Sequence, residues 1–515
     1  MQKIRLSFLL LFSTALLWAQ MDNHKLSELI EKTRSTFDVP GISVGIIKDG
    51  KVVYAQGHGV ASLKDQRPMN EKTLVGIASN SKGFTATALA MLVDEGKLSW
   101  DDRVQKHLPE FQMYDPYVSK NITVRDLITH RSGLGLGQGD LMFFPEGGTL
   151  SIKDIVHNVR YLKPQNDFRS TLDYNNIMFI VAGEVISRIS GKSWAEFIEE
   201  RILRPVGMLS SYGSYNRALG VENKIDAHAP VGGKAVAVPH DWNETANAAG
   251  GIMSSVEDML VWADFLMKGF TTKDGKKLVS DRQIQQLWQI QQPSPVALQN
   301  PYDTKYYGYG LGWFVSDVKG VRQIQHSGGL IGTVTHFTLL PEKNLGIVVL
   351  TNQQSGAAFT ALTNTIKDAY LGLEDRDWVG TLSARTTQST KRFEEQKKTA
   401  YEKAANFKKQ KNQQIDPSNF LGTYKDPWFG EVVLSNENGS YRIVSKTSPR
   451  LKGTLLPYSP VAFIAQWDDR SYDADAYFTL EMDQDGKATG AKMKAISDIT
   501  DFSFDFQDLD LKKVP

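Results

Sequence analysis

The sequence predicts an α+β domain followed by a smaller all-β domain. β-prone runs lie at residues 46–54 and 333–350, and helical patterns dominate from about Ser79 to Leu203 between them. Strands near both ends of a helical middle are typical of an α+β domain whose sheet needs both ends of the segment. After Asp416 the chain becomes turn-rich and strand-like, which predicts a small antiparallel barrel or sandwich.

The composition is that of an ordinary globular protein. Of the 515 residues, 41% are hydrophobic and 23% are charged, which excludes a disordered, collagen-like or polytopic membrane chain. The 59 Lys and Arg residues balance the 58 Asp and Glu residues, so no global charge favours nucleic acid as a partner. The sequence has no Cys, which excludes disulfides, thiolate zinc sites and a cysteine nucleophile.

Residues 1–19 have the pattern of a cleavable signal peptide. Lys3 and Arg5 supply positive charge, Leu6–Trp18 form an apolar stretch of 13 residues, and Ala19 is a small residue suited to cleavage. Thirteen apolar residues are too few to span a bilayer, and no other stretch approaches the length needed. A buried N-terminal helix is the alternative, but nothing amphipathic follows at helical spacing. We therefore expect an exported protein, periplasmic or secreted, with no integral membrane span.

The elements of the α+β domain, which we place at residues 22–380, follow from turn chemistry and periodicity. Asp49-Gly50 lies between two β-prone runs and predicts an early hairpin. A helix is expected from about Ser79 to Gly96. Its predicted buried stripe comprises Phe84, Ala88, Met91 and Leu92. β-prone runs return at 310–315 and 333–350.

A basic amphipathic helix is predicted as a linker at residues 381–415. Residues 391–412 carry eight Lys or Arg and three Asp or Glu. Four apolar residues recur at the spacing of one helical face: Phe393, Ala400, Ala404 and Phe407. We expect this face to dock on a neighbouring part of the protein. A membrane-surface helix is the alternative, but the apolar face is thin for that role.

The all-β domain is placed at residues 416–515. Asn438-Gly439 lies between the β-prone runs Val432–Leu434 and Tyr441–Val444, which predicts a hairpin. Asp485-Gly486 marks a second hairpin of the same kind.

Ser79-Asn80-Ser81-Lys82 carries the first chemical signal at the start of the predicted helix. At this spacing Ser79 lies in the first turn, and Lys82 lies one turn further on the same face. A serine hydroxyl is a poor nucleophile until a base removes its proton, and this spacing brings an amine within reach. The free N–H groups of the helix N-terminus can hold a developing oxyanion, and its partial positive charge favours the neutral form of the lysine.

Two other stretches match short catalytic patterns in the wrong context. Ser316-Asp317-Val318-Lys319 repeats the Ser-x-x-Lys spacing, yet it lies in an apparent strand, so its side chains would not share a helical face. Gly41-Ile42-Ser43-Val44-Gly45 fits the nucleophile-elbow pattern, but a hairpin follows Ser43 where a helix is required. Ser79 is therefore the candidate nucleophile.

Two more short motifs follow along the chain. Tyr174-Asn175-Asn176 precedes an apolar helix at Ile177–Ile186, and His326-Ser327-Gly328-Gly329 precedes the strand-like run 333–340. Taken singly, the first fits a helix cap with a buried ring and the second fits a turn. Their order after the Ser-x-x-Lys motif carries more information than either motif alone.

In this order the three motifs resemble those of the serine β-lactamase and penicillin-binding-protein superfamily, which are Ser-x-x-Lys, Tyr-x-Asn and then Lys-Thr-Gly or His-x-Gly. Ile122–Gly133, Arg204–Met208 and Ala249–Gly251 also look like the family. The resemblance covers roughly Leu26–Leu371 and points to the class C β-lactamase-like branch, which includes D-aminopeptidases, D-alanyl-D-alanine carboxypeptidases and esterases. It implies a β-lactamase/transpeptidase-like fold, in which helices flank an antiparallel sheet beside a helical region.

The resemblance also implies catalytic roles. Ser79 would be the acylated nucleophile, Lys82 its proton acceptor or partner, and Tyr174 a second general acid or base. The backbone N–H groups of Ser79 and Gly329 would form the oxyanion hole. Together these roles describe two-step acyl transfer without a cofactor or a metal ion.

Further residues are implied to contact the substrate, which we expect to be a small molecule or a short peptide. These residues are Asn176, His326, Ser327 and Gly328. Asn176 would contact a substrate amide, and His326 would face the carboxylate or leaving group. His130, in the stretch Ile122–Gly133, has two interpretations, a proton shuttle and a structural hydrogen bond, of which the second is favoured.

One departure from the family pattern affects the expected substrate. β-Lactamases of class C typically have Lys-Thr-Gly where this chain has His326-Ser327-Gly328. A neutral imidazole offers a β-lactam carboxylate one hydrogen bond and little Coulomb energy. We therefore expect a serine hydrolase for D-amino-acid-containing peptides or amides, or for small esters, with β-lactam turnover slow at best. The alternatives are a penicillin-binding sensor that acylates without turnover and a true class C-like β-lactamase; metal-dependent hydrolysis lacks a ligand spacing among the nine His residues.

The C-terminal part, from Phe420–Tyr424 through Thr500–Asp505, looks like the lipocalin-like β domain that is often appended to these hydrolases. Three roles are open for it. It could cap the active site and restrict substrate size, bind a separate apolar ligand, or serve as a structural appendage.

Overall fold

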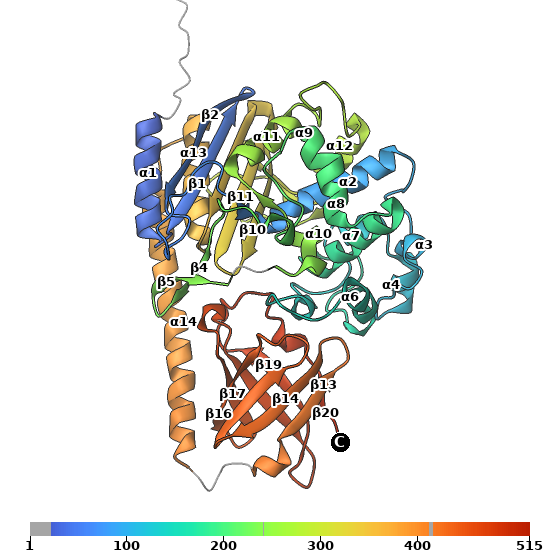
Figure 1. The fold of residues 1–515 in the computed structure, drawn as a ribbon, viewed down its shortest axis with the longest axis vertical. Coiled ribbons are helices and arrows are strands. Elements are labelled where there is room, and N and C mark those ends of the chain that lie inside the picture. The colour runs from blue at the N-terminus through green and yellow to red at the C-terminus, as the bar shows by residue number, and fades with distance from the viewer. Residues whose placement is uncertain (1–21, 240–241, 411–415) are drawn as a thin grey trace, which may run out of the picture.

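The computed structural model describes residues 22–239, 242–410 and 416–515. The predicted signal peptide at residues 1–19 lies outside these ranges. Figure 1 shows a larger α+β domain above a closed β-barrel, with one long helix running along both. Within the described ranges, no helix combines the length and apolar character needed to cross a membrane.

An eight-stranded antiparallel sheet forms the centre of the α+β domain. In spatial order its strands are β2 (Lys51–Gly59), β1 (Gly41–Lys48), β12 (Leu345–Thr351), β11 (Thr333–Leu340), β10 (Val321–Leu330), β9 (Phe314–Val318), β8 (Tyr307–Tyr309) and β7 (Gln292–Pro293). β1 pairs with β12 in a register that sets Ile42 opposite Thr351. The predicted hairpin at Asp49-Gly50 joins β1 to β2, and the expectation that the sheet needs both ends of the domain is confirmed.

Helices cover both faces of this sheet. α1 (Asn23–Thr36) and α13 (Gly356–Leu371) pack on one face, against a cluster that includes Val44 and Ile347. α11 (Val256–Met267) packs on the other face, where Gly45 lies close to its side chains. Successive residues of β1 therefore point to two buried faces, which explains its unbroken apolar sequence.

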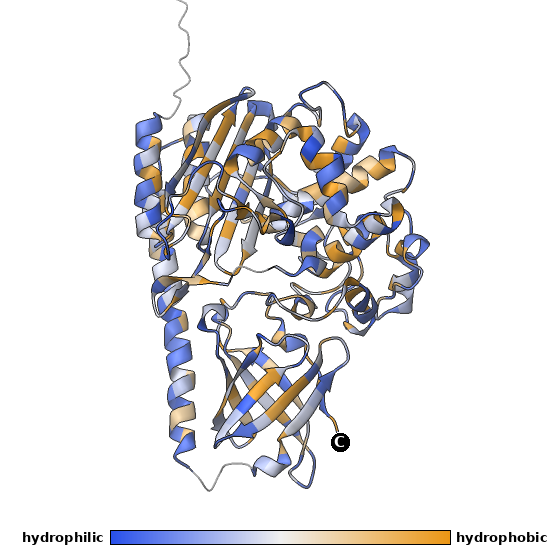
Figure 2. Cartoon of the chain, in the orientation of Figure 1, coloured by the Kyte–Doolittle hydropathy of each residue, from blue (hydrophilic) through white to orange (hydrophobic). Residues whose placement is uncertain are grey.

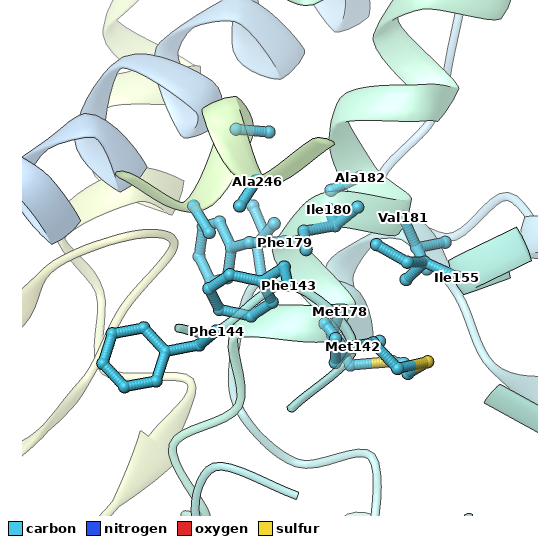
Figure 3. Packing of buried hydrophobic residues seen from close by; sticks show 14 of the residues in the cluster. Met142, Phe143, Phe144, Ile155, Met178, Phe179, Ile180, Val181, Ala182 and Ala246 are labelled. Carbon is cyan, nitrogen blue, oxygen red and sulfur yellow. The ribbon is translucent and has the colours of Figure 1, made fainter. Parts of the chain in front are cut away.

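The helical region beside the sheet is built around α2 (Ser81–Asp94) and α7 (Asn176–Ser190). The predicted stripe, Phe84, Ala88, Met91 and Leu92, is buried, but so is every other residue of α2 from Ser81 to Leu92, so burial extends around the whole helix. A helix that is surrounded by protein can be apolar all round. Figure 3 shows Phe143 near Phe179 of α7, whereas the ring of Phe144 points away from this helix.

Shorter elements complete the α+β domain. They are β3 (Val75–Gly76), α3 (Val104–His107), α4 (Pro116–Asn121), α5 (Val124–Leu127), α6 (Ile152–Asn158), α8 (Trp194–Ile198), α9 (Arg204–Val206), β4 (Ala227–Val231), β5 (Lys234–Val238), α10 (Asn247–Gly250), β6 (Met253–Ser254) and α12 (Asp281–Trp288).

A single helix, α14 (Trp378–Lys408), connects the two domains. Trp378, at the start of α14, belongs to the apolar cluster that α1 and α13 form with one face of the sheet. Near the end of α14, Ala400 and Ala404 pack against Ile464 and Ile496 of the barrel. The apolar face predicted from the sequence is therefore buried against a neighbouring domain. Most of the remaining surface of α14 is hydrophilic (Figure 2).

The C-terminal domain is a closed antiparallel barrel of eight strands. The strands are β13 (Gly422–Asp426), β14 (Gly430–Glu437), β15 (Ser440–Ser445), β16 (Lys452–Ser459), β17 (Ala462–Trp467), β18 (Ala476–Met482), β19 (Ala488–Ala495) and β20 (Leu511–Lys513). Both predicted hairpins are present, as β14–β15 and β18–β19. Side chains including Phe429, Trp467 and Phe506 leave an internal pocket of only about 10 Å³, at the lower limit for a single water molecule.

Candidate active site

The three sequence motifs converge on a cavity of about 400 Å³. Ser79, Tyr174, Asn176, His326 and Gly329 all line it. They come from a short 3-10 turn before α2, from the loop before α7 and its first residue, and from β10. Segments that are far apart in the sequence therefore place their candidate functional groups around one space.

Ser79 lies in a 3-10 turn, η1 (Ala78–Asn80), and α2 begins only after it. This corrects the expectation that Ser79 belongs to the first turn of the helix itself. Ala78 has a φ of 51°, in the left-handed region that residues with a side chain seldom adopt. Asn80 Nδ2 donates to Thr335 Oγ1 over 2.8 Å, which fastens the turn to β11. The candidate nucleophile thus lies on a strained turn, and the hydrogen bond from Asn80 to β11 holds this turn against the sheet.

Gly328 allows β10 to lie directly against this turn. A Cβ atom at Gly328 would be 2.3 Å from the carbonyl oxygen of Ile77 and 2.9 Å from the Cβ of Ala78. At Gly329 the nearest such neighbour is 3.9 Å away. The His-Ser-Gly-Gly motif therefore lies within a strand, and the alternative interpretation of it as a turn is wrong.

Lys82 is fully buried, and its amine contacts three oxygen atoms. Nζ donates to Ser79 Oγ over 2.9 Å, to Asn176 Oδ1 over 2.7 Å and to the Ala249 carbonyl over 2.8 Å. Burial lowers the pKa of Lys82 from 10.5 to about 7, while the Asp140 carboxyl acts to raise it. Near neutral pH a substantial fraction of the amine is therefore unprotonated and able to accept a proton.

The amide of Asn176 is oriented by a buried carboxyl group. Its Oδ1 accepts from Lys82, and its Nδ2 donates to Asp140 Oδ2 over 2.8 Å. Asp140 begins a second 3-10 turn, η2 (Asp140–Met142). Burial raises the pKa of Asp140 to about 7, although the hydrogen bonds from Asn176 and Ser503 act to lower it.

The loop that carries Tyr174 is held by its neighbours. Asn175 caps α7 by accepting from the Met178 N–H over 3.2 Å, and its own N–H donates to His130 Nδ1 over 3.0 Å. Burial holds the pKa of His130 well below 6.5, so the ring is neutral at pH 7. The favoured interpretation of His130, a structural hydrogen bond, is confirmed.

The hydroxyl group of Tyr174 is buried near Ser79. In the part of the chain that the structure describes, this hydroxyl completes no hydrogen bond of good geometry. Burial raises the pKa of the phenol well above 10, and the Ser79 hydroxyl lowers it to a smaller extent. Lys82 Nζ lies 4.9 Å from the centroid of the Tyr174 ring. Tyr174 therefore keeps its proton at neutral pH and can donate it.

His326 lines the cavity, but both of its ring nitrogens are engaged by the protein. Nδ1 lies 2.6 Å from the Ser327 carbonyl oxygen, and Nε2 lies 3.0 Å from the Tyr309 hydroxyl. A carbonyl only accepts, so Nδ1 carries the hydrogen and Nε2 accepts from Tyr309. Burial lowers the pKa of His326 to about 3. His326 is therefore an uncharged part of the cavity wall. The next residue, Ser327, is exposed.

Neither of the rejected serine motifs reaches this cavity. Ser43 is buried in β1, and its hydroxyl donates to the Asn70 carbonyl over 3.1 Å. Ser316 lies in β9, and Lys319 follows in the turn after that strand. The structural context used to reject both motifs is confirmed.

The barrel supplies part of the cavity wall. Asp501, Phe502 and Ser503 line it, and the ring of Phe502 lies 6.0 Å from that of Tyr174. Of the three roles left open for the C-terminal domain, the structure therefore supports a cap over the active site. The barrel pocket lined by Phe429, Trp467 and Phe506, at about 10 Å³, is too small for a separate apolar ligand.

The charges around the cavity are unevenly distributed. Among the described residues that line it, Asp501 is the one acidic or basic side chain outside neutral His326; the residue has exposed surface, while desolvation raises the pKa of its carboxyl group. Lys82 lies behind Ser79, and His326 is neutral. The cavity therefore presents no fixed cation to a substrate carboxylate. The described residues contain no group of three or more His, Asp or Glu placed to hold a metal ion.

A family model described as Beta-lactamase matches residues 26–371, two thirds of the chain. The chain belongs to this family. A second model, described as Domain of unknown function (DUF3471), matches residues 408–513, which include the barrel. The Beta-lactamase match spans η1, α7 and β10, so all three motifs lie within it.

Curated relatives match this Beta-lactamase family member at moderate identity. It is 29% identical over 362 residues to Unguisins hydrolase ungD' of Aspergillus campestris (strain IBT 28561) and 27% identical over 345 residues to Protein flp of Staphylococcus aureus (strain NCTC 8325 / PS 47). The matches cover 67% and 64% of this chain. They span 65% and 63% of the lengths of those two relatives.

Solved structures share the fold of this family member. An octameric penicillin-binding protein homologue from Pyrococcus abyssi has a TM-score of 0.59 and 22% identity, over 96% of this chain and all of that one. A class C beta-lactamase has a TM-score of 0.55 and 22% identity, over 70% of this chain and 99% of that one. The predicted β-lactamase/transpeptidase-like fold with a C-terminal barrel is confirmed.

Several groups at the site were not found from the sequence. Asp140, Asp501, Phe502, Ser503 and Tyr309 belong to no motif with a recognisable spacing. Their roles depend on contacts with distant segments. Ser503, for example, donates a hydrogen bond to Asp140, which is 363 positions away in the sequence. A local pattern carries no signal for such contacts.

Proposed function

We propose that this protein is a serine hydrolase that works through an acyl-enzyme on Ser79. The observation that carries the proposal is the 2.9 Å hydrogen bond between Lys82 Nζ and Ser79 Oγ at the base of a cavity. Ser79 Oγ attacks a substrate carbonyl, its proton passes to a base, and the leaving group departs to give an ester of Ser79. A water molecule then attacks that ester and releases the acid.

Lys82 is the base that this geometry favours. Its pKa of about 7 makes the neutral amine available near pH 7, whereas the phenol of Tyr174 is held protonated by burial. Lys82 would take the proton of Ser79, and Tyr174 would give its own proton to the leaving group. The opposite directions of the two pKa shifts, downward for Lys82 and upward for Tyr174, support this division of roles.

The backbone N–H groups of Ser79 and Gly329 are the proposed oxyanion hole. Both residues line the same cavity, on the two segments that Gly328 brings together. Fixed N–H donors at such a position stabilise the negative charge that develops on the carbonyl oxygen. The position of Asn176 on the cavity wall supports a contact with a substrate amide.

The proposed substrates are D-amino-acid-containing peptides or amides, or small esters. Asp501 at the cavity wall and the lack of a lining cation disfavour an anionic group, including the carboxylate of a β-lactam. A neutral or cationic substrate is favoured for the same reason. The printed name of one relative, Unguisins hydrolase, supports hydrolysis as the class of reaction.

A hydrolysis panel tests the proposal. D-alanyl p-nitroanilide, a D-Ala-D-Ala dipeptide, p-nitrophenyl acetate and a chromogenic cephalosporin are compared in the wild type and in Ser79→Ala. We expect the cationic amide or the ester to be hydrolysed with the highest kcat/KM, and Ser79→Ala to be inactive on all four. Highest kcat/KM on the cephalosporin would identify a true β-lactamase. An adduct that is stable for hours in mass spectrometry would identify a sensor.

We also propose that the protein is exported to the periplasm or the medium, on the strength of the sequence pattern at residues 1–19. N-terminal sequencing of the protein recovered from the producing cell tests this directly. A mature chain that begins near Gln20 is expected, and a chain in the cytoplasm that still carries residues 1–19 would contradict it.

A further inference from the structure

A continuous path of hydrogen bonds joins the candidate catalytic lysine to the barrel domain. Lys82 Nζ donates to Asn176 Oδ1 over 2.7 Å, and Asn176 Nδ2 donates to Asp140 Oδ2 over 2.8 Å. The same Asp140 oxygen accepts from Ser503 Oγ over 2.8 Å. The first three residues belong to the α+β domain, and Ser503 belongs to the loop between β19 and β20 of the barrel.

We propose that Asp140 and Ser503 are positioning residues that hold the amide of Asn176 toward Lys82, so that the barrel completes the active site of the α+β domain. This inference rests on the proposed function, since it gives the barrel a part in the reaction at Ser79. It assigns to the barrel a role that a passive cap would not have.

Asp140 orients the amide of Asn176. An amide has an oxygen that accepts on one side and an NH₂ group that donates on the other. An ionised Asp140 only accepts hydrogen bonds, so it selects the orientation that turns the NH₂ group toward itself. The oxygen of Asn176 is then left facing the amine of Lys82. Without Asp140 the amide is free to turn and present an N–H group to that amine.

The barrel also holds the backbone on both sides of Asp140. The carboxylate of Asp505 accepts from the Gly139 N–H over 2.6 Å and from the Leu141 N–H over 3.0 Å. Asp140 lies between these two residues and is bonded through its own side chain to Ser503. Three hydrogen bonds from one barrel loop therefore fix the position of this carboxyl group.

Misplacement of these groups carries a free-energy cost because they are buried. Lys82, Asp140 and Asp505 are all buried, and a buried polar group that loses its hydrogen-bond partner is destabilised because water cannot replace that partner. Asp140 Oδ1 already has no partner among the described residues, so its other oxygen carries the hydrogen bonds from Asn176 and Ser503. Loss of one of these bonds therefore weakens the restraint on the other.

The test uses the full-length protein and the rate at which Ser79 is acylated by p-nitrophenyl acetate. Ser503→Ala is expected to lower the acylation rate and kcat by about 10-fold, with KM changed less than 3-fold, because loss of a hydrogen bond to a charged group has an effect of this order. Ser503→Thr keeps a hydroxyl group and is expected to restore most of the rate. Thr500→Val is the matched control, since Thr500 lies in the same loop and bonds the Asp473 carbonyl instead.

A double-mutant cycle separates positioning from mere folding of the loop. Asp140→Leu removes the acceptor and keeps a similar volume, and it is expected to lower kcat at least as much as Ser503→Ala. In the Asp140→Leu background, Ser503→Ala is expected to cost less than 2-fold, because its partner is already gone. Melting temperatures and circular dichroism spectra establish that each variant is folded.

Three results would overturn the inference. The first is a folded Ser503→Ala variant with the wild-type acylation rate, and the second is an equal loss in Ser503→Ala and Thr500→Val. The third is additive losses in the double-mutant cycle. The proposed function fails by a different result, hydrolysis retained in Ser79→Ala, so the two failures are distinguished by one set of measurements.

Discussion

The Nζ atom of Lys82 lies 2.9 Å from the Oγ atom of Ser79, although a change from a 3-10 turn to an α-helix separates the two residues. This geometry joins a potential nucleophile to an amine whose pKa is lowered to about 7 by burial. Both groups are held by the surrounding protein, one by the turn at Ala78 and the other by three oxygen acceptors. The predictions below follow from this pair and its neighbours.

Lys82→Arg is expected to lower the rate of acylation by roughly 10² to 10⁴-fold, the usual contribution of a general base. A guanidinium keeps the positive charge but cannot be deprotonated at accessible pH. Labelling with an active-site serine probe measures the effect. Lys398→Arg, on the exposed face of α14, is the control for the substitution itself. Labelling of Lys82→Arg at the normal rate would assign the base to Tyr174.

The pH dependence of kcat/KM is expected to follow the deprotonation of Lys82. Asp140, His130, His326 and Tyr174 surround this amine, and the two imidazoles are neutral above pH 6 because burial lowers their pKa values. Only the neutral amine accepts a proton, so kcat/KM rises with pH and levels off above a pKa near 7. Asp140→Asn removes the charge that raises the pKa of Lys82, and the rise is expected at lower pH. A rise centred near pH 10 would contradict the assignment.

Tyr174→Phe is expected to affect amides more than activated esters. The leaving amine of an amide must be protonated as it departs, whereas p-nitrophenolate leaves without a proton. We expect kcat/KM for a D-aminoacyl alkyl amide to fall by about 10²-fold and that for p-nitrophenyl acetate to fall by less than about 10-fold. Steady-state kinetics on the two substrates provides the comparison. Equal losses on both would argue that Tyr174 has only a structural role.

Gly328→Ala is expected to destabilise the protein, and Gly329→Ala is expected not to. A Cβ atom at Gly328 would overlap the backbone of Ile77, so β10 would have to move away from the turn that carries Ser79. Overpacking of this kind costs roughly 1–3 kcal/mol of unfolding free energy. Thermal or denaturant unfolding of the two variants checks the difference. Equal stability would show that β10 and the turn are not tightly packed at Gly328.

Sequence patterns were sufficient for the elements that depend on neighbouring residues. The hairpin at Asp49-Gly50 and the one at Asn438-Gly439 were predicted because turn residues act locally. Ser79 and Lys82 were found because they are three residues apart. The apolar face of α14 was found because its residues recur at helical spacing.

Features that depend on contacts between distant segments could not be predicted from the sequence. The stripe expected on α2 is buried, but the sequence pattern did not predict that tertiary packing also buries the other sides of this helix. Asn176 and His326 were identified through a family resemblance, since Tyr-x-Asn and His-x-Gly are too short to be specific. Asp140 and Ser503 were missed because their role depends on the hydrogen bond between them. The two residues are 363 positions apart in the sequence and belong to different domains.

The measurement that tests the central claim most directly is peptide mapping by mass spectrometry after labelling with a fluorophosphonate probe. The proposed mechanism predicts a single adduct on the peptide that contains Ser79, and no adduct in Ser79→Ala under the same conditions. Equal labelling of the wild type and Ser79→Ala, or an adduct on another serine, would contradict it.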